Sequence, residues 1–452
     1  MDCISCPSGF NVKIRSKAIF YILLYLIAIV TPLIGIIIFN PNTEEGFLDN
    51  LGMSFAILGF TILSFQFILS TRIKWFERPF GLDIILYFHR AMAIFAVFLL
   101  LIHPILLSAG SKGFSLLYRL DVSPFIWTGR GVLILLLIII FISMYRVTIR
   151  MDFQRWLRAH STLSIIIVLG GFLHSFFIGM DFEQLPMQIL WIFLLVQALF
   201  FYVYHRNLRL KRLHRNIYRV VDVVQESHNV YTLKFQPSKG TAPLQYLPGQ
   251  FHFITLHRED FQPVEEHPFT ISSSPSQKDI ISSTIKFSGD FTSTIHQTKP
   301  GHKVLIDGAY GRFSYTLFPE ENKLVFIAGG IGITPFRSML YHMRDTRSDK
   351  AVRLIYANRT QKDIVFFEEL AELEKEDLPN LKVTHILSKP DENWTGQTGK
   401  LSGERIKQLC ENDFYNLSFY ICGPPGMTDK LALELRHSGI HYSQIHLEKF
   451  SF

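Results

Sequence analysis

The sequence predicts a multi-domain membrane protein in three parts. These are an all-α bundle of six transmembrane helices at residues 1–210, an antiparallel β-barrel at 211–318 and an α/β domain at 319–452. Three observations support this division. Long apolar runs are confined to the first 205 residues, and short alternating runs punctuated by Pro and Gly follow them. From Lys323 onward, apolar strands alternate with glycine turns and helical patterns, which is typical of a nucleotide-binding α/β layer.

Six apolar runs account for the first part, and most are long enough to cross about 30 Å of hydrocarbon. They lie at residues 18–39, 51–70, 82–108, 131–145, 160–179 and 187–204. The fourth run is short, so we expect its helix to extend outward from Trp127. The first run lacks a small-residue cleavage site and therefore predicts a retained helix, not a signal peptide.

Lys and Arg side chains are concentrated at one set of helix ends, before the first run and after the second, fourth and sixth. The positive-inside rule places these ends in the cytoplasm, so both termini are predicted to be cytoplasmic and the protein integral to a plasma or inner membrane. The net charge of +7 arises partly from these anchors, and it does not indicate nucleic-acid binding. Cys3 and Cys6 form an isolated CxxC pair to which we assign no role.

Four histidines lie inside the apolar runs in two pairs of identical spacing. His89 and His103 belong to the third run, His160 and His174 to the fifth, and the members of each pair are 14 residues apart. Fourteen residues of α-helix turn through about 1400° and rise about 21 Å, so both imidazoles project from nearly one face at two depths. Two such helices side by side would offer two facing imidazole pairs, each able to hold an iron porphyrin.

These histidines also allow other interpretations. A single intramembrane histidine can be satisfied by a backbone carbonyl, but two matched pairs point to function because ionisable groups are costly in lipid. Zinc is disfavoured because these segments supply neither a thiolate nor a carboxylate. A transporter or channel with a nucleotide-sensing domain, in which the histidines relay protons, is an alternative of another class.

Three motifs in the second half of the chain carry chemistry. In LVFIAGGIGITPFRSML, a buried strand leads through a glycine turn into a helix, an arrangement that lets backbone N–H groups approach a pyrophosphate. In FYICGPPGM, small residues end another strand at the edge where open α/β sheets bind ligands. The third motif is HPFT at residues 267–270. Taken singly, each is also compatible with an ordinary turn or strand end.

In order, PGQF, HPFTISS, IKFSGDFT, DGAYG, AGGIGITP and CGPPGM follow a six-helix segment with paired histidines. This order resembles the NADPH oxidase and ferric reductase transmembrane family, whose cytoplasmic half is similar to ferredoxin–NADP reductase. The resemblance covers nearly the whole chain. It implies FAD in the β-barrel, NADPH or NADH at the α/β domain and two b-type haems in the bundle. The implied axial ligands of the haem irons are His89 with His160 at the inner level and His103 with His174 at the outer level.

The resemblance also implies roles for residues around the nucleotides. Phe269 would lie along the isoalloxazine ring after Pro268, with Thr270 at the polar edge of the ring and His267 toward the FAD phosphates. The pyrophosphate contact would involve Lys286, Gly289 and Thr292. The dinucleotide site would be formed by Gly329, Gly330, Gly332, Thr334, Pro335, Cys422, Gly423, Pro424 and Met427. In relatives a C-terminal aromatic covers the flavin, and Phe450 is the first candidate and Phe452 the second.

Arg359, in YANRT, would contact the adenosine 2′-phosphate, because a guanidinium suits this bidentate anion, and it predicts a preference for NADPH. The implied reaction takes electrons from NAD(P)H through FAD and both haems to an acceptor outside the cytoplasm. Oxygen, giving superoxide, is favoured over a ferric or other metal chelate. Partner subunits and oligomeric state leave no trace in the sequence.

Overall fold

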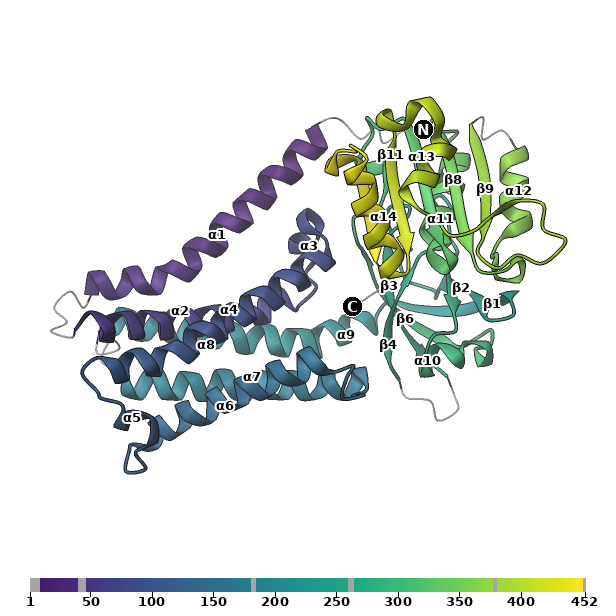
Figure 1. Cartoon of the computed structure of the whole chain (residues 1–452). Coiled ribbons are helices and arrows are strands. Elements are labelled where there is room, and N and C mark those ends of the chain that lie inside the picture. The colour runs from purple at the N-terminus through teal and green to yellow at the C-terminus, as the bar shows by residue number, and fades with distance from the viewer. Residues whose placement is uncertain (1–8, 40–45, 180–183, 259–263, 377–379, 450–452) are drawn as a thin grey trace. The chain divides into compact units, whose positions relative to one another are not determined.

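The computed structural model describes residues 9–39, 46–179, 184–258, 264–376 and 380–449. The chain divides into two compact units, one formed by residues 13–211 and the other centred on residues 212–452 (Figure 1). The first unit is helical and the second contains two β-sheets. Cys3, Cys6, Phe450 and Phe452 lie outside the described residues.

Within the described residues, six helices of the first unit are long and apolar enough to cross a membrane. They are α1 (Gly9–Phe39), α2 (Phe47–Leu69), α4 (Leu82–Ala109), α6 (Pro124–Tyr145), α7 (Phe153–Ile178) and α8 (Leu185–Val203). The predicted six-helix part is thereby confirmed, and the fourth helix does extend past Trp127, because it begins at Pro124. The shorter helical elements are α3 (Lys74–Phe80), α5 (Ser115–Tyr118), η2 (Tyr204–Leu208) and α9 (Arg209–Leu213).

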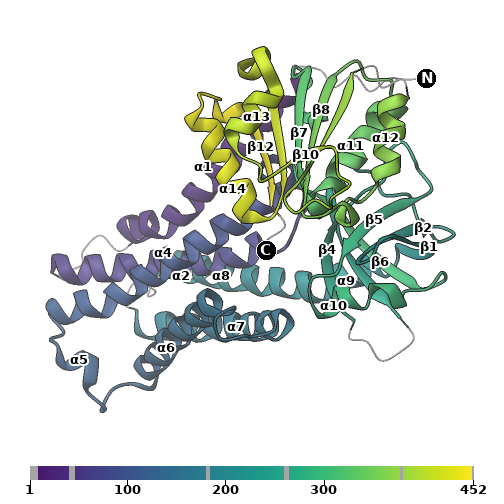
Figure 2. The same ribbon diagram turned by 45° about the vertical axis from the view of Figure 1, so that its right-hand side comes forward.

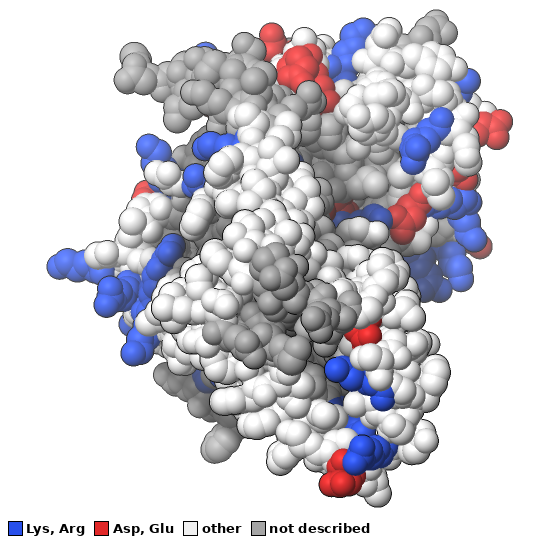
Figure 3. Space-filling view, turned by 90° about the vertical axis from the view of Figure 1, so that its left-hand side faces the viewer, with Lys and Arg blue, Asp and Glu red and all other residues white. Residues whose placement is uncertain are grey.

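The outer surfaces of these helices carry large apolar side chains, for example Ile27, Phe98 and Phe141, each more than half exposed. Exposed apolar side chains of this kind suit hydrocarbon rather than water. Figure 3 views the molecule from the side that lies at the left of Figure 1, where most of the described side chains are also uncharged.

Small residues let the helices approach one another. A Cβ on Gly59 of α2 would lie 2.7 Å from Cγ of Leu100 and 3.2 Å from the carbonyl oxygen of Ala96, both on α4. Close backbone approach of this kind is how membrane helices associate without a hydrophobic driving force. Deeper in the unit, an apolar cluster joins α4, α6 and α7 through Val97, Leu136 and Ile167.

The first sheet of the second unit is antiparallel, with strand order β4-β3-β6-β1-β2-β5. Its strands are β1 (Ile217–Ser227), β2 (Val230–Pro237), β3 (Phe251–His257), β4 (Glu266–Thr270), β5 (Ile281–Lys286) and β6 (Lys303–Tyr310). The prediction of a closed barrel is only approximate. No ladder joins the described residues of the edge strands β4 and β5, but just past β4 the N–H of Ser272 donates to the carbonyl of Ser282 at 2.8 Å. The two edges of the sheet therefore approach each other past the end of β4 without a continuous ladder between the described residues of β4 and β5.

The second sheet is parallel, with order β10-β9-β8-β7-β11-β12, and helices cover both faces (Figure 2). Its strands are β7 (Lys323–Gly329), β8 (Ala351–Asn358), β9 (Leu381–Leu387), β10 (Gln397–Thr398), β11 (Ser418–Gly423) and β12 (Ile445–Lys449). The helices are α11 (Thr334–Asp345), α12 (Phe367–Lys375), α13 (Gly403–Cys410) and α14 (Pro425–His437). The strand order reverses between β7 and β11, and open α/β sheets bind ligands outside the carboxyl ends of strands at such a point.

Single turns complete this unit. They are α10 (Asp290–Ser293), η3 (Ile295–Gln297), η4 (Tyr315–Leu317), η5 (Gly330–Ile333), η6 (Gln361–Asp363), η7 (Glu411–Asn416) and η8 (Tyr442–Gln444). Apolar side chains pack on both faces of the parallel sheet, with Phe336 and Leu370 in one core and Ile406 and Leu431 in the other. The α/β layer predicted from Lys323 onward is confirmed.

Candidate functional site

The four intramembrane histidines lie on two helices, His89 and His103 on α4 and His160 and His174 on α7. The ring centres of His89 and His160 are 6.3 Å apart, and their planes are inclined by 57°. His103 and His174 are close enough to interact electrostatically. The structure therefore brings the histidines together in the combination expected from their spacing, one pair at each of two depths.

Backbone carbonyls fix the orientation of the outer imidazoles. Nδ1 of His103 lies 2.9 Å from the carbonyl oxygen of Gly52, and Nδ1 of His174 lies 2.8 Å from that of Phe125. Because a carbonyl oxygen only accepts hydrogen bonds, Nδ1 carries the proton in both rings. Nε2 then keeps a free lone pair, which is the tautomer that a metal-ligating histidine needs.

At the inner level, a hydroxyl and an indole hold His160. Its Nδ1 lies 3.4 Å from Oγ of Ser143, and the same Oγ accepts a hydrogen bond from Nε1 of Trp156 at 3.2 Å. The Trp156 ring also lies against the imidazole, with the ring centres 5.3 Å apart. These contacts restrain the imidazole through its Nδ1 and through its ring, and they leave Nε2 without a part in them.

Gly129 of α6 makes room for His174, a contact that the sequence analysis missed. A Cβ on this glycine would lie 2.6 Å from Cε1 and Nδ1 of the imidazole, far inside van der Waals contact. Two residues further along the helix, a Cβ on Gly131 would meet nothing within 4 Å. The TGRG sequence alone could not show which of the two glycines faces the histidine, because this depends on how α6 packs on α7.

Each histidine pair supplies two nitrogen ligands. Among the described residues, no group of three or more His, Cys, Asp or Glu side chains could hold a metal ion. A structural zinc site needs four protein ligands, whereas an iron porphyrin brings four in-plane nitrogens and needs two axial ones. The donor set of each pair fits a tetrapyrrole.

In the second unit, the HPFT motif forms most of β4. The ring of His267 stacks on Phe291 with centres 3.9 Å apart, and Phe269 lies parallel to Phe291 at 6.4 Å. Nε2 of His267 lies 3.0 Å from Oε2 of Glu265. Burial lowers the pKa of His267 despite the opposing effect of Glu265, so its imidazole is neutral near pH 7.

A permanent positive charge lies beside this motif. The guanidinium of Arg258 lies 5.4 Å from the centre of the Phe291 ring, and its Nη1 donates to the carbonyl and the hydroxyl oxygen of Thr294 at 2.8 and 2.9 Å. Arg258 was not predicted as a site residue from the sequence. A basic residue directly after β3, the strand that pairs with β4, was the available signal.

The IKFSGDFT segment, residues 285–292, begins at the end of β5. Gly289 has φ +125°, and a Cβ there would meet nothing within 4 Å, so this backbone is open to an approaching group. Thr292 closes the turn, because its hydroxyl accepts a hydrogen bond from the N–H of Ser288 at 2.7 Å. Lys286 is close enough to Asp363 of η6 for an electrostatic interaction. Lys286 therefore lies near the loop that begins at Arg359.

The two predicted glycine motifs of the parallel sheet lie side by side. A Cβ on Gly332 would lie 2.2 Å from the carbonyl oxygen of Cys422, and one on Gly329 would lie 2.6 Å from Cε of Met427. A Cβ on Gly423 would lie 3.1 Å from Cα of Gly329. Gly330 has φ +53° and open space on its Cβ side. The turn therefore has one closely packed side and one accessible side.

The helices that follow the two motifs begin with proline. Pro335 lies in the first turn of α11 directly after Thr334, whose hydroxyl donates to the carbonyl of Ile331 at 3.1 Å. Pro424 is the residue before the first turn of α14. The free N–H groups at such helix starts suit an anion. Arg359 is exposed just past the carboxyl end of β8.

Cys422 and Glu448 are paired residues of β11 and β12. Burial, with a further contribution from Glu448, raises the pKa of the Cys422 thiol. Oε2 of Glu448 lies 4.0 Å from the Cβ position of Gly311, so this carboxylate lies where the two sheets of the unit meet. Glu448 was not predicted as a site residue from the sequence, because only the aromatic residues of the terminal EKFSF segment carried a functional expectation.

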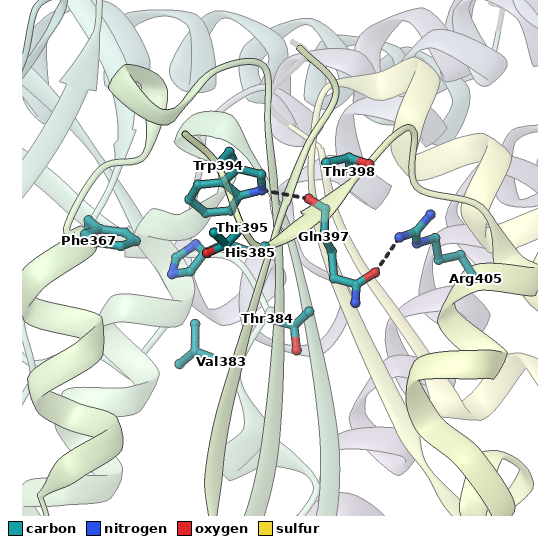
Figure 4. A pocket seen from close by; sticks show the side chains of 10 residues that line it. Phe367, Val383, Thr384, His385, Trp394, Thr395, Gln397, Thr398 and Arg405 are labelled. Carbon is teal, nitrogen blue, oxygen red and sulfur yellow. Dashed lines mark hydrogen bonds between the residues drawn. The ribbon is translucent and has the colours of Figure 1, made fainter. Parts of the chain in front are cut away.

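An open pocket of about 520 Å³ lies at the β9–β10 edge of the parallel sheet (Figure 4). It is lined mainly by aromatic and polar side chains, including Phe367, His385, Trp394, Gln397 and Arg405. Nε1 of Trp394 donates to the carbonyl of Gln397 at 3.1 Å, which fixes the indole over the pocket. Burial lowers the pKa of His385 to about 4. The pocket contains none of the predicted site residues, and β9 lies two strands away from the glycine turn after β7.

Comparison with protein families matches three segments of the chain. Residues 55–171 match the ferric reductase like transmembrane component, residues 216–314 an FAD-binding domain and residues 326–432 the oxidoreductase NAD-binding domain. These segments correspond to the helical unit, the antiparallel sheet and the parallel sheet.

Curated relatives match about half of the chain or less. The glycine betaine monooxygenase reductase subunit of Pseudomonas aeruginosa is 32% identical over 245 residues, covering 52% of this chain and 64% of the relative. NADH-cytochrome b5 reductase 2 of Debaryomyces hansenii is 31% identical over 169 residues, covering 36% of this chain and 56% of the relative. The chain therefore spans less than two thirds of the length of these relatives.

Solved structures also resemble the chain. The FAD/NAD-binding domain of nitric oxide dioxygenase from Vibrio cholerae is 23% identical, with a TM-score of 0.47 over 52% of this chain and 98% of that domain. Flavohemoglobin from Malassezia yamatoensis is 18% identical, with a TM-score of 0.49 over 89% of this chain and 96% of its own. The three family matches together give the chain a ferric reductase like transmembrane component, an FAD-binding domain and an oxidoreductase NAD-binding domain, a domain set that matches a ferric reductase and NADPH oxidase-like family with a module like that of ferredoxin–NADP reductase, and six long apolar helices among the described residues make it an integral membrane protein.

Proposed function

We propose that this protein moves electrons from cytoplasmic NADPH, through FAD and two b-type haems, to an acceptor on the far side of the membrane. The observation that carries the proposal is the separation of the inner imidazoles, His89 and His160. The histidine pair at the outer level and the two nucleotide motifs support it.

The inner pair is spaced like two axial ligands of one metal. A bond of about 2.0 Å from metal to nitrogen, plus about 1.1 Å from nitrogen to ring centre, puts the centres of two axial imidazoles about 6.2 Å apart. The measured separation is 6.3 Å. A direct hydrogen bond between the rings would bring the centres to about 5 Å. The spacing is therefore compatible with an intervening metal and too long for a direct hydrogen bond between the two rings.

The outer pair would hold the second haem. Carbonyl acceptors already fix the tautomer of His103 and His174, leaving Nε2 of each ring free for iron. When bound, haem supplies one-electron transfer, and ligation by two imidazoles favours electron transfer over direct chemistry at iron. The chain positions the rings. The apolar cluster of Val97, Leu136 and Ile167 would keep water out of the space between the two depths. The helical rise separates these depths by about 21 Å.

The antiparallel sheet, in the proposed domain 211–318, would bind FAD, which when bound converts two-electron chemistry into single-electron steps. Pro268, Phe269 and Thr270 would line the isoalloxazine along β4. His267 would point toward the phosphates, and the guanidinium of Arg258, beside Phe291, would supply a permanent positive charge near them. The proposed pyrophosphate contacts are Lys286, Gly289 and Thr292.

The parallel sheet, in the proposed domain 319–452, would bind NADPH at the β7–β11 switch point. The glycine turn and the facing strand end would hold the dinucleotide through Gly329, Gly330, Gly332, Thr334, Pro335, Cys422, Gly423, Pro424 and Met427. Arg359 would bind the 2′-phosphate. Phe450, or else Phe452, would cover the flavin, and β12 ends at Lys449, directly before Phe450.

The helical unit, in the proposed domain 1–210, would have both termini on the cytoplasmic side, as the distribution of Lys and Arg indicates. The outer haem would then face outward, where we propose oxygen as the acceptor, with superoxide as the product. A ferric chelate is the second candidate, and the match of residues 55–171 to a ferric reductase component favours it.

The test uses the purified full-length protein in detergent. We expect two haems b per FAD, a bis-imidazole absorption spectrum and reduction of both haems by NADPH under anaerobic conditions. Steady-state rates with oxygen and with an anaerobic ferric chelate then identify the acceptor. A colourless membrane unit that binds nucleotide would instead favour a nucleotide-regulated transporter.

A further inference from the structure

We propose that Arg337 is a positioning residue that sets the dinucleotide-binding helix α11 against the flavin-binding strand β4. The inference rests on the proposed function, because it concerns how the nicotinamide is aligned with the flavin. It assigns a role to a side chain that belongs to neither nucleotide motif.

Arg337 lies in the first turn of α11, two residues after Pro335. Its guanidinium makes three hydrogen bonds to two different segments. Nη1 donates to the carbonyl of Ser272 at 2.8 Å. Nε and Nη2 donate to Oε1 and Oε2 of Glu369 on α12 at 2.6 and 3.0 Å. Two parallel bonds of this kind fix the plane of a guanidinium as well as its position.

Aromatic rings complete the surroundings of this guanidinium. Cζ of Arg337 lies 4.7 Å from the ring centre of Phe366 and 4.8 Å from that of Tyr341, and the side chain is only 18% exposed. Phe366 has φ +62° and immediately precedes α12, at the end of the loop that begins at Arg359. Arg337 therefore belongs to the helix that follows the glycine turn, contacts Phe366 at the end of the loop of the proposed 2′-phosphate contact, and binds the segment that follows β4.

Two more hydrogen bonds join α11 to this last segment, residues 272–274. We call the three contacts between α11 and residues 272–274 the 272–274 seam. The hydroxyl of Ser338 donates to the carbonyl of Ser273 at 2.6 Å, and the hydroxyl of Ser274 donates to Oδ2 of Asp345 at 2.6 Å. The seam begins only two residues after Thr270, at the proposed polar edge of the flavin. Three α11 side chains take part in the seam: Arg337, Ser338 and Asp345. Among the described hydrogen bonds of these side chains, those of Arg337 also reach α12, through Glu369.

Alignment at this seam matters because hydride transfer requires the reacting atoms to be about 3–3.5 Å apart, and a misplacement of about 1 Å costs on the order of 100-fold in rate. Loss of the guanidinium would leave α11 held to residues 272–274 by two hydroxyl bonds alone. Lysine keeps the charge but cannot form the bidentate fork or stack as a plane. We therefore expect Arg337→Lys to behave like Arg337→Gln, although milder.

The experiment compares full-length Arg337→Lys and Arg337→Gln with a matched control, Arg344→Gln. Arg344 lies on the same helix and stacks on the same Tyr341 ring at 4.3 Å, but its ion pairs are to Asp345 and Glu376 at 3.4 and 3.7 Å. Three quantities are measured: amide hydrogen exchange at residues 271–274, the affinity for NADP⁺, and the rate constant of anaerobic flavin reduction by NADPH with its deuterium isotope effect.

In both Arg337 variants we expect exchange at residues 271–274 to accelerate by about fivefold or more. We also expect the reduction rate constant to fall by about tenfold or more, with a larger isotope effect. NADP⁺ affinity should change less than about threefold, and Arg344→Gln should match the wild type in all three quantities. Unchanged exchange, or faster exchange with an unchanged reduction rate constant, would overturn the inference. A loss of reducible flavin at an unchanged rate constant would overturn it too.

Two further outcomes are separable. If Arg337→Gln does not retain FAD, Arg337→Lys decides by the same criteria. If NADPH does not reduce the flavin of the wild type, the proposed function fails. The exchange comparison then still decides whether Arg337 holds the 272–274 seam.

Discussion

Gly129→Ala is expected to remove the outer haem and leave the inner one in place. The new Cβ would lie 2.6 Å from Cε1 and Nδ1 of His174, whereas carbon atoms pack at about 3.5–4.0 Å. The imidazole must therefore move by about 1 Å or α6 must shift away from α7. Either movement breaks the 2.8 Å bond between Nδ1 and the carbonyl of Phe125 and displaces Nε2 from its axial position.

The strain is of the size that overpacked cores show, about 1–3 kcal/mol, which corresponds to a weakening of haem binding by about 5- to 150-fold. The assay is the haem-to-FAD ratio of the purified protein, which we expect to fall from about two to about one. Reduction of the far-side acceptor should be lost, and reduction of FAD by NADPH should survive. Gly131→Ala is the matched control because its Cβ meets nothing within 4 Å. If Gly129→Ala kept both haems and the acceptor rate of Gly131→Ala, the placement of His174 as a ligand would be refuted.

Three more predictions test other parts of the account. His103→Ala should lose the outer haem and acceptor reduction but keep FAD reduction by NAD(P)H, and intact acceptor reduction would remove the two-haem pathway. Arg359→Ala should lower the ratio of NADPH to NADH efficiency in steady-state kinetics, and an unchanged ratio would exclude Arg359 from the 2′-phosphate site. Burial lowers the pKa of His252 to about 3. Between pH 6.5 and pH 3, this imidazole therefore binds a proton in the unfolded state but not in the folded state. The stability of its domain should be full above pH 6.5 and fall by at most about 1.4 kcal/mol per pH unit toward pH 3. His252→Gln should flatten this dependence in thermal unfolding followed by flavin fluorescence, and an unchanged slope would show that His252 is not its source.

Spacing along single elements could be predicted from the sequence. The 14-residue separation of His89 and His103 determines the face and depth of both side chains once the segment is a helix, and α4 is one unbroken helix. The strand–glycine–helix order around Gly330 determines the turn in the same way. Helix ends were less predictable from apolar runs. α7 begins at Phe153, before its apolar run, because Asp152 accepts a hydrogen bond from the N–H of Arg155 at 3.0 Å and caps the helix.

Contacts between distant elements could not be predicted. Gly129 faces His174 because of the way α6 packs on α7, and nothing in its own sequence separates it from Gly131. Arg258 follows β3 and contacts Phe291 of the single turn α10, which lies 33 residues later in the sequence. Glu448 approaches Gly311 because β12 extends the parallel sheet toward the segment after β6. These residues act through tertiary geometry, which a single sequence does not contain.

The central claim is that two haems are held by imidazole pairs at two depths and receive electrons from NADPH. Its most direct test is the anaerobic absorption spectrum of the full-length protein during titration with NADPH, with haem and FAD quantified in the same sample. The account predicts about two bis-imidazole haems per FAD, both reduced by NADPH. A protein that contains FAD but no haem, or haem that stays oxidised while the flavin is reduced, would contradict it.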